Sequence, residues 1–215
     1  MPVKENTISY QTTNTYSVLN SIGPNTKNIW IACHGIGYLS KYFIRYFNKF
    51  TKEENYIICP QAPSKFYQGN DFRYVGASWL TKVNTQQETE NVLNYLDAMY
   101  EVEKTNFKDK RIILMGYSQG VSVVMRWMSK RNINCNDLVI HSGSIPKEVT
   151  PTDFKNHQHI HVHLICGNQD EYINEEKLKI QLNFAKSLFT NQLNLYEFDG
   201  KHEVNPAILE QIAEK

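Results

Sequence analysis

Short, nearly continuous apolar runs constrain the fold of this chain more than any other feature of its sequence. In the run Ile112-Ile113-Leu114-Met115, for example, no polar residue interrupts the apolar ones. Strands of this kind are covered on both faces, as in a mainly parallel sheet between two layers of helices. We predict strands at residues 28–33, 56–59, 111–115, 138–140, 161–166 and 193–198.

Most of these runs are separated by segments in which apolar residues recur at steps of three and four, which indicates helices. Such segments lie at residues 92–100, 121–128, 178–188 and 207–212, and Pro206 opens the last one. Strands that alternate with helices predict a doubly wound α/β fold, with helices on both faces of the sheet. The first 20 residues are expected to add one or two leading strands, antiparallel at a sheet edge.

Length and charge narrow the class of protein. A chain of 215 residues suits one domain, which we assign to residues 1–215. The formal net charge of +1 provides no field for nucleic acid or an anionic membrane surface, so we expect neither as a partner. No apolar run approaches the roughly 18 residues of a membrane span, and no signal peptide opens the chain. This predicts a cytoplasmic protein without integral membrane association.

The four cysteines form no C-x-x-C pair, and three of them lie in or at the end of apolar runs. We therefore predict buried free thiols in a reducing compartment, and not a disulfide or metal framework. The residues concerned are Cys33, Cys59, Cys135 and Cys166.

The sequence Gly116-Tyr117-Ser118-Gln119-Gly120 lies between a predicted strand and a predicted helix. In this context G-x-S-x-G is typical of a nucleophilic serine on a sharp turn, where small residues let strand and helix approach closely. Ser118 is the predicted nucleophile. The amide of Gln119 begins the helix, where unpaired N–H groups favour an anion, and it is expected to form half of an oxyanion hole. The alternative is a serine-capped helix after a tight turn.

A serine nucleophile needs a base, and the base needs a carboxylate that orients it. In folds of this kind the acid and then the histidine follow the nucleophile along the chain. Asp170 follows the predicted strand at 161–166 and His202 follows the one at 193–198, so both stand at carboxyl ends of strands. We assign them as acid and base. Rivals that fit the order or the placement less well are Asp153, Asp199, His34 and His141.

Two loops are expected to complete the site. The glycine-rich loop after the strand at 28–33 contains Ile36, whose amide is the candidate second donor of the oxyanion hole. Residues 61–85 form the longest segment without a predicted element, too long for an idle connection. Its aromatic residues are expected to wall an apolar substrate site, although packing against the sheet or a contact between two copies fits nearly as well. They are Phe66, Tyr67, Tyr74 and Trp79.

Histidines alternate at positions 157, 159, 161 and 163, a spacing that places four imidazoles on one face of a strand. The pattern suggests a metal site, but no well-placed cysteine or carboxylate completes it in the sequence. We therefore predict no metal and expect solvated or hydrogen-bonded histidines.

Seven short motifs occur in one order along nearly the whole chain, and with them the sequence resembles the phospholipase/carboxylesterase family of α/β-hydrolases, which includes the acyl-protein thioesterases. His34-Gly35-Ile36-Gly37 stands for the family's H-G-L-G, and residues 116–120 stand for G-F-S-Q-G. The other five are Pro60-Gln61-Ala62-Pro63, Ser78-Trp79, Ser142-Gly143, residues 167–170 and residues 200–202.

The resemblance implies a cofactor-independent hydrolase that cleaves a small-molecule carboxylic ester or thioester. It implies Ser118, Asp170 and His202 as the triad, and the amides of Ile36 and Gln119 as the oxyanion hole. The chain departs from the family at Tyr38, at Leu80-Thr81 and at Val121. Because the first two positions lie near the acyl pocket in relatives, the substrate class is not carried over.

Two other functions stay open at this point. A catalytically silent binding module would keep the fold but would lack part of the triad. In this sequence every residue type that the triad requires is present. A peptidase, or a hydrolase of another activated carbonyl, would use the same triad and would differ in its leaving group.

Overall fold

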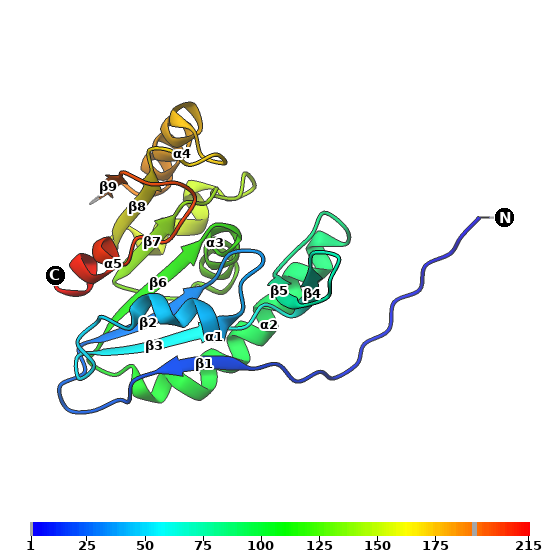
Figure 1. Ribbon diagram of the computed structural model, residues 1–215, viewed down its shortest axis with the longest axis horizontal. Coiled ribbons are helices and arrows are strands. Elements are labelled where there is room, and N and C mark those ends of the chain that lie inside the picture. Colours follow the sequence, from blue (N-terminus) through cyan, green and yellow to red (C-terminus); the bar gives the residue numbers. More distant parts are fainter. Residues whose placement is uncertain (1, 191–192) are drawn as a thin grey trace.

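A seven-stranded sheet forms the centre of the computed structural model, which describes residues 2–190 and 193–215 (Figure 1). The strand order is β1-β3-β2-β6-β7-β8-β9. β1 runs antiparallel to β3, and every other neighbouring pair is parallel. The strands are β1 (Tyr16–Leu19), β2 (Asn28–Cys33), β3 (Asn55–Pro60), β6 (Arg111–Tyr117), β7 (Asp137–His141), β8 (His161–Gly167) and β9 (Leu193–Phe198).

The predicted parallel sheet is confirmed, and all six predicted strands are present. Four of them extend one or two residues beyond the predicted bounds, because polar residues and glycines at strand ends still pair in the ladder. Gly116, for example, pairs with Cys33 on one side and with Ile140 on the other.

The amino-terminal segment contributes a single strand, β1, at the antiparallel edge of the sheet. Of the one or two leading strands expected there, the structure has one, because residues 2–15 form none. Ile8 and Tyr10 are 86% and 82% exposed. Their alternating pattern meets no neighbouring strand, whereas Tyr16 pairs with Pro60 of β3.

Helices cover both faces of the sheet (Figure 1). One face packs against α2 (Thr85–Glu103), α3 (Gln119–Arg131) and α4 (Glu175–Leu188), and the other against α1 (Ser40–Phe43) and α5 (Pro206–Ala213). Alternate residues of β2 show the division, since Ile29 and Ile31 join the first core and Trp30 joins the second. The short helices η1 (Ile44–Phe47), η2 (Lys104–Asn106) and η3 (Pro151–His157) complete the helical elements of the described residues.

The predicted helices are confirmed, and α1 and η1 were not predicted because each is too short to show a periodic pattern. None of the described helices combines the length and the apolar character that a membrane crossing requires. All four cysteines are buried free thiols, as predicted. Burial raises the pKa of the Cys33 thiol well above its usual value.

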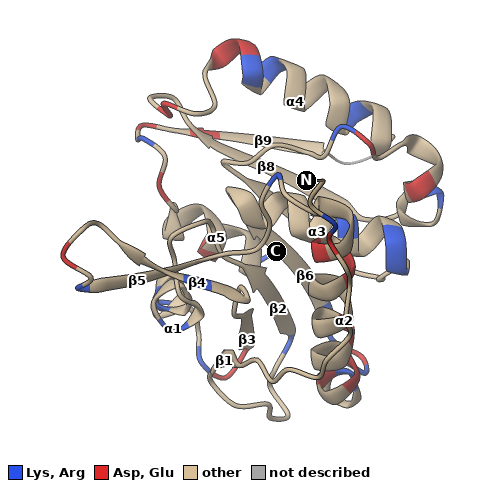
Figure 2. Cartoon of the chain, turned by 90° about the vertical axis from the view of Figure 1, so that its right-hand side faces the viewer, with Lys and Arg blue, Asp and Glu red and all other residues tan. Residues whose placement is uncertain are grey.

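Residues 61–85, predicted as a long loop, contain an antiparallel hairpin of β4 (Ser64–Gln68) and β5 (Tyr74–Ser78). The hairpin projects away from the main sheet (Figure 2). Every residue of β4 is exposed, so the sequence carries no burial pattern that identifies a strand. The amide of Gly37 ties the hairpin to the loop after β2 by donating to the carbonyl of Ala77 at 2.9 Å.

The four alternating histidines do not share one strand face, and that expectation is wrong. His157 ends the helix η3, and only His161 and His163 lie in β8. A helical turn ahead of the strand breaks the two-residue period that the sequence suggests. Within residues 2–190 and 193–215, no group of three or more His, Cys, Asp or Glu side chains is arranged to hold a metal ion.

A buried ion pair lies at the amino ends of the central strands. Both carboxylate oxygens of Asp137 accept hydrogen bonds from Arg111 at 2.7 Å, and His163 lies 2.8 Å from one of them. The Asp137 side chain is fully buried. Burial by itself raises the pKa of a carboxyl group, but the hydrogen bonds from His163 and Arg111 outweigh it and hold the pKa of Asp137 below its usual value of 3.8.

Replacing Asp137 by Asn should lower the free energy of unfolding by about 3 kcal/mol at neutral pH, because Arg111 loses a fully buried counter-charge. The folded-state pKa of Asp137 lies below the unfolded value, so its contribution is complete above that value and is lost as the pH falls through the folded pKa. Urea unfolding at about pH 7 and about pH 3 measures both effects. Glu148→Gln, which removes an exposed pair with Arg126, should cost under about 1 kcal/mol. Equal losses in the two variants would contradict this account.

Candidate active site

Ser118 lies on the turn between β6 and α3, with φ at 52° and ψ at −117°. A positive φ is uncommon for a residue with a side chain and persists only where the surrounding structure enforces it. Here the Ser118 amide donates to the carbonyl of His141 on β7 at 2.9 Å. The turn therefore holds the hydroxyl at the carboxyl end of the sheet, in the strand-turn-helix context of the G-x-S-x-G motif.

The two glycines of the motif have no room for a side chain. A Cβ atom on Gly120 would lie 2.1 Å from the carbonyl oxygen of Cys33, and one on Gly116 would lie 2.4 Å from the Cα atom of Val121. Both approaches are far shorter than van der Waals contact. Glycine at these positions lets α3 begin directly against β6 and β2.

Ser118, Asp170 and His202 come together above the ends of β6, β8 and β9. His202 Nε2 lies 2.9 Å from Ser118 Oγ, and His202 Nδ1 lies 2.8 Å from Asp170 Oδ2. The other oxygen of Asp170 accepts the amides of Tyr172 and Ile173 at 2.8 and 2.9 Å. These bonds fix the orientation of the Asp170 carboxyl group. His202 therefore donates from Nδ1 and is free to accept the Ser118 proton at Nε2.

The rival acids and bases are engaged elsewhere. Asp199 accepts a hydrogen bond from Gln169 at 2.6 Å, and Asp153 caps the helix η3. Burial lowers the pKa of His34 to about 4 and that of His141 to about 3, so both imidazoles are neutral near pH 7. Each one accepts a backbone amide instead of contacting Ser118.

Two hydrogen bonds fix the loop that carries His202. The Tyr117 hydroxyl donates to the carbonyl of His202 at 2.9 Å, and the amide of Asn205 donates to His141 Nε2 at 3.0 Å. The ring of Tyr172 packs edge-on against the His202 imidazole, with centroids 4.7 Å apart. These supporting roles are not predicted from the sequence. Their one signal was proximity, since Tyr117 precedes the nucleophile and Tyr172 follows Asp170 by two positions.

The loop after β2 lies directly against Ser118. It turns at residues 35–38, and Gly37 has φ at 84°, the backbone that the third position of a type II turn requires. A Cβ atom on Gly35 would lie 3.1 Å from the Cβ atom of Ser118. The turn therefore brings Ile36 to the edge of the cavity that contains Ser118.

The two expected oxyanion donors flank Ser118 and are unengaged. Within the part of the chain that the structure describes, the amides of Ile36 and Gln119 donate to no protein acceptor. Gln119 is the first residue of α3, and the first N–H groups of a helix have no partner within it. Both amides are available to an anion beside Ser118.

Trp79 is buried and links two segments that border Ser118. Its side chain is 1% exposed, and its indole donates to the carbonyl of His34 at 2.8 Å. Its amide donates at 2.8 Å to the side chain of Gln119, which in turn donates to the carbonyl of Leu80 at 2.7 Å. Trp79 thus ties the loop after β2 to the start of α3 and is not among the residues that line the cavity.

A cavity of about 560 Å³ opens beside Ser118. Its aliphatic side chains come from Ile36 and Ile173, and Lys177 is the lysine among its lining residues. Seven further lining residues carry a hydroxyl group. They are Tyr38, Tyr117, Ser118, Ser122, Ser142, Ser144 and Tyr172.

The aromatic residues of the hairpin lie outside this cavity. Phe66, Tyr67 and Tyr74 are 40%, 59% and 58% exposed, and none of them is among the residues that line it. The sequence places these aromatic residues in the segment 61–85. It does not indicate that this segment folds outward as a hairpin. That outward fold separates them from Ser118.

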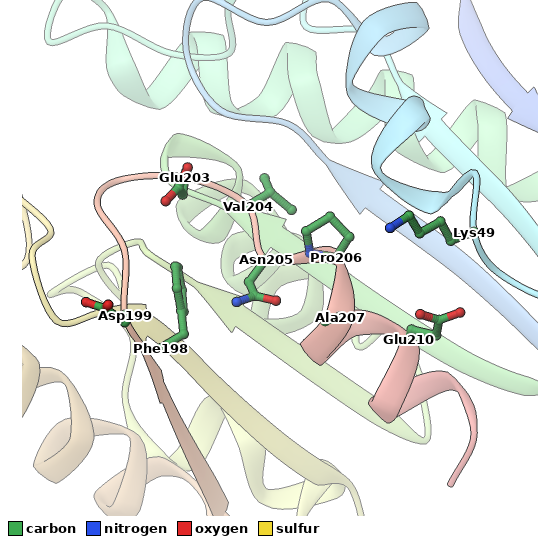
Figure 3. Close-up of a pocket in the computed structure, with 9 residues that line it drawn as sticks. All are labelled: Lys49, Phe198, Asp199, Glu203, Val204, Asn205, Pro206, Ala207 and Glu210. Atoms are coloured by element: carbon green, nitrogen blue, oxygen red, sulfur yellow. The ribbon is translucent and has the colours of Figure 1, made fainter.

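A second, smaller cavity of about 250 Å³ lies beside the loop that carries His202 (Figure 3). Glu203, Val204 and Asn205 of that loop line it, with Pro206 at the start of α5. Figure 3 shows Lys49 at one side of the cavity, near Glu210 of α5. Ser118 is not part of this lining.

Replacing Gly120 by Ala should destabilise the fold by about 1–3 kcal/mol, because the new methyl group meets the Cys33 carbonyl. The displaced turn should also slow the reaction of Ser118 with a fluorophosphonate probe. Urea unfolding and the rate of labelling measure the two effects. Gly23→Ala is the matched control, since nothing lies within 4 Å of a Cβ atom there. Equal stability and labelling in both variants would show that the close contact is not required.

The family model of phospholipases and carboxylesterases matches residues 14–215 of this chain. No curated protein matches the sequence. Three solved structures share the fold. Acyl-protein thioesterase 2 of Zea mays is 14% identical, covers 94% of this chain and 97% of its own, and has a TM-score of 0.72.

The second is the esterase PE8, which is 19% identical, covers 94% of this chain and 97% of its own, and has a TM-score of 0.69. The third is a phospholipase/carboxylesterase of Dyadobacter fermentans, 14% identical, with 96% of this chain and 99% of its own covered and a TM-score of 0.66. At these identities the structures establish the α/β-hydrolase fold. The match over residues 14–215 confirms the resemblance seen in the motifs, and the chain belongs to the phospholipase/carboxylesterase family.

Proposed function

We propose that this protein is a serine hydrolase that cleaves carboxylic esters or thioesters through an acyl-enzyme on Ser118. The observation that carries the proposal is the unbroken chain of contacts from Ser118 Oγ through the His202 imidazole to buried Asp170, at 2.9 and 2.8 Å. Such a chain lets the imidazole accept the serine proton while the carboxylate stabilises the resulting imidazolium.

In the first half-reaction, Ser118 Oγ attacks the substrate carbonyl carbon and its proton passes to His202 Nε2. The carbonyl oxygen takes up the negative charge and is held by the amides of Ile36 and Gln119. When the tetrahedral intermediate collapses, His202 gives the proton to the departing alcohol or thiol. An acyl group then remains on Ser118.

In the second half-reaction, water attacks the acyl carbon while His202 takes one of its protons. The same two amides hold the oxyanion again, and His202 returns the proton to Ser118 as the carboxylic acid leaves. Asp170 fixes the imidazole in the same tautomer throughout, because two backbone amides and the His202 Nδ1–H hold its carboxylate in place.

Two features favour hydrolysis over a silent binding role. The strained φ of Ser118 is kept although a relaxed turn would stabilise the fold. The donors of Ile36 and Gln119 are likewise unused by the described protein atoms. A peptidase would use the same groups, and the family match favours the ester or thioester bond.

The proposed binding site is the cavity at Ser118, whose volume suits a small-molecule substrate. Phe66, Tyr67 and Tyr74 lie outside it, and we assign Trp79 a positioning role. Four buried free thiols fit a reducing compartment, and we propose the cytoplasm as the location.

Replacing Ser118 by Ala should lower kcat for ester hydrolysis by about 10⁴- to 10⁶-fold, because the nucleophile is lost. Steady-state hydrolysis of p-nitrophenyl esters from acetate to laurate, together with palmitoyl-CoA, measures the effect and the preferred leaving group. Ser129→Ala, on the same helix with its hydroxyl bound to the Arg126 carbonyl, is the control and should keep wild-type rates. Equal turnover by Ser118→Ala and the control would refute the proposal.

Replacing Ile36 by Pro removes one oxyanion donor and should lower kcat by about 10²- to 10³-fold. Proline suits the second position of a type II turn, so the loop can keep its shape. Ile36→Ala removes the exposed side chain but keeps the N–H, and should retain kcat within a few-fold. The proposal fails for this donor if the two variants have the same kcat. Circular dichroism checks that both are folded.

A further inference from the structure

The lining of the active-site cavity carries a positive charge and no negative one. Among the described residues that line the cavity, none is Asp or Glu, and Lys177 contributes an ammonium group. Four serines and three tyrosines line the same space. An ammonium group without a competing carboxylate in the lining suits a substrate that carries an anionic group close to the reacting carbonyl.

Lys177 is held at the cavity by its backbone surroundings. It lies in the first turn of α4, and its Nζ donates to the carbonyl of Tyr172 at 2.8 Å. One turn further along the same face of the helix, Gln181 accepts the amide of Ile145 at 2.7 Å. That bond joins α4 to the loop after β7, so Lys177 and this loop form one continuous wall. An ammonium group has three donors, and two remain for a ligand.

Ser142, in the loop after β7, faces the cavity with a hydroxyl that is oriented by a buried imidazole. The amide of Asn205 donates to His141 Nε2 at 3.0 Å, so the His141 proton lies on Nδ1. Nδ1 lies 3.1 Å from Ser142 Oγ, which therefore accepts from it. Because His141 is fully buried and stays neutral, this tautomer is fixed.

The consequence is an O–H group that is free to donate, on a residue that lines the cavity. In the described part of the chain the Ser142 hydroxyl has no acceptor of its own, since its one hydrogen bond is with the donor His141. Ser142 also has a positive φ of 47°, an uncommon conformation for a residue with a side chain. A serine that only fills space in the core needs neither a positive φ nor a neighbouring imidazole that donates to its hydroxyl.

We propose that Lys177 and Ser142 form a subsite for a carboxylate group carried by the substrate. The proposal rests on the proposed function, because the subsite lies in the cavity of Ser118. The ammonium supplies the charge and the hydroxyl a directed hydrogen bond to a carboxylate oxygen. The preferred substrates are then short esters or thioesters with a free carboxylate on the acyl or the alcohol portion, and not neutral esters of long aliphatic chains.

The test compares matched pairs of esters that differ by one carboxylate. Monomethyl succinate and methyl butyrate differ on the acyl side, and 4-acetoxybenzoate and phenyl acetate differ on the alcohol side. Hydrolysis followed by pH-stat gives kcat/KM for each ester. For the wild type, the anionic member of at least one pair should be preferred by about 10- to 100-fold, the effect of one charge-assisted contact.

Lys177→Gln should lower this anionic-to-neutral ratio by about tenfold or more, mainly through KM, and Lys177→Arg should restore most of it. Ser142→Ala should lower the ratio several-fold without a change in the charge of the wall. Lys179→Gln, on the exposed face of the same helix, is the matched control and should leave the ratio unchanged. Added salt should reduce the preference of the wild type, because screening weakens the charge–charge attraction.

The two proposals fail in different ways. Hydrolysis of the neutral esters that depends on Ser118, with a ratio near one or a ratio that Lys177→Gln leaves unchanged, would overturn the carboxylate subsite and leave the hydrolase intact. Absence of Ser118-dependent hydrolysis of every ester would overturn the proposed function, and the subsite with it.

Discussion

The contact between Gly120 and the carbonyl oxygen of Cys33 fixes the geometry on which the rest of the site depends. Cys33 is the last residue of β2, and Gly120 is the second residue of α3. Because their backbones meet without an intervening side chain, the loop that leaves β2 must pass directly over the turn at Ser118. One packing constraint thereby brings the nucleophile, the start of a helix and the Ile36 turn to one point.

Two buried neutral histidines hold the loops on either side of Ser118, one with Ile36 and one with His202. His34 accepts the amide of Ala62 at 3.1 Å and holds the loop with Ile36, while His141 accepts the amide of Asn205 and holds the loop with His202. Burial keeps both imidazoles neutral near pH 7, so each retains a lone pair for its backbone partner. The imidazole in contact with the Ser118 hydroxyl is that of His202, whose side chain is 16% exposed and stands at the cavity.

A buried aspartate lies at each end of the sheet, and the two have different partners. At the amino ends of the strands, Asp137 is fully buried and its charge is matched by Arg111. At the carboxyl ends, Asp170 is also buried but is hydrogen-bonded to His202, whose second nitrogen lies against Ser118. A buried carboxylate thus stabilises the fold at one end, and at the other end it belongs to the proposed proton-transfer chain. Tyr38, where the family has Asp, belongs to an aromatic group with Tyr46 and Tyr117 and adds a hydroxyl to the cavity wall.

The sequence by itself determined the sheet, the helix layers and the segments that meet at Ser118. Continuous apolar runs, helical spacing and glycines beside a serine are local patterns, and each one reports on residues adjacent in the chain or one turn apart. The meeting of Ser118, Asp170 and His202 was also predictable. Each residue follows a strand, and parallel strands bring their carboxyl ends to one edge of the sheet.

Only the tertiary structure decided which side chains form the cavity. Phe66, Tyr67 and Tyr74 read as pocket residues in the sequence, yet their segment folds into a hairpin that turns outward from the sheet. Lys177 carries no local signal, and the motif Ser142-Gly143 does not indicate a role for its serine. The two residues share a wall because Gln181 joins α4 to the loop after β7. Contacts of this kind depend on how distant segments pack, and the spacing of residues along the chain contains no record of them.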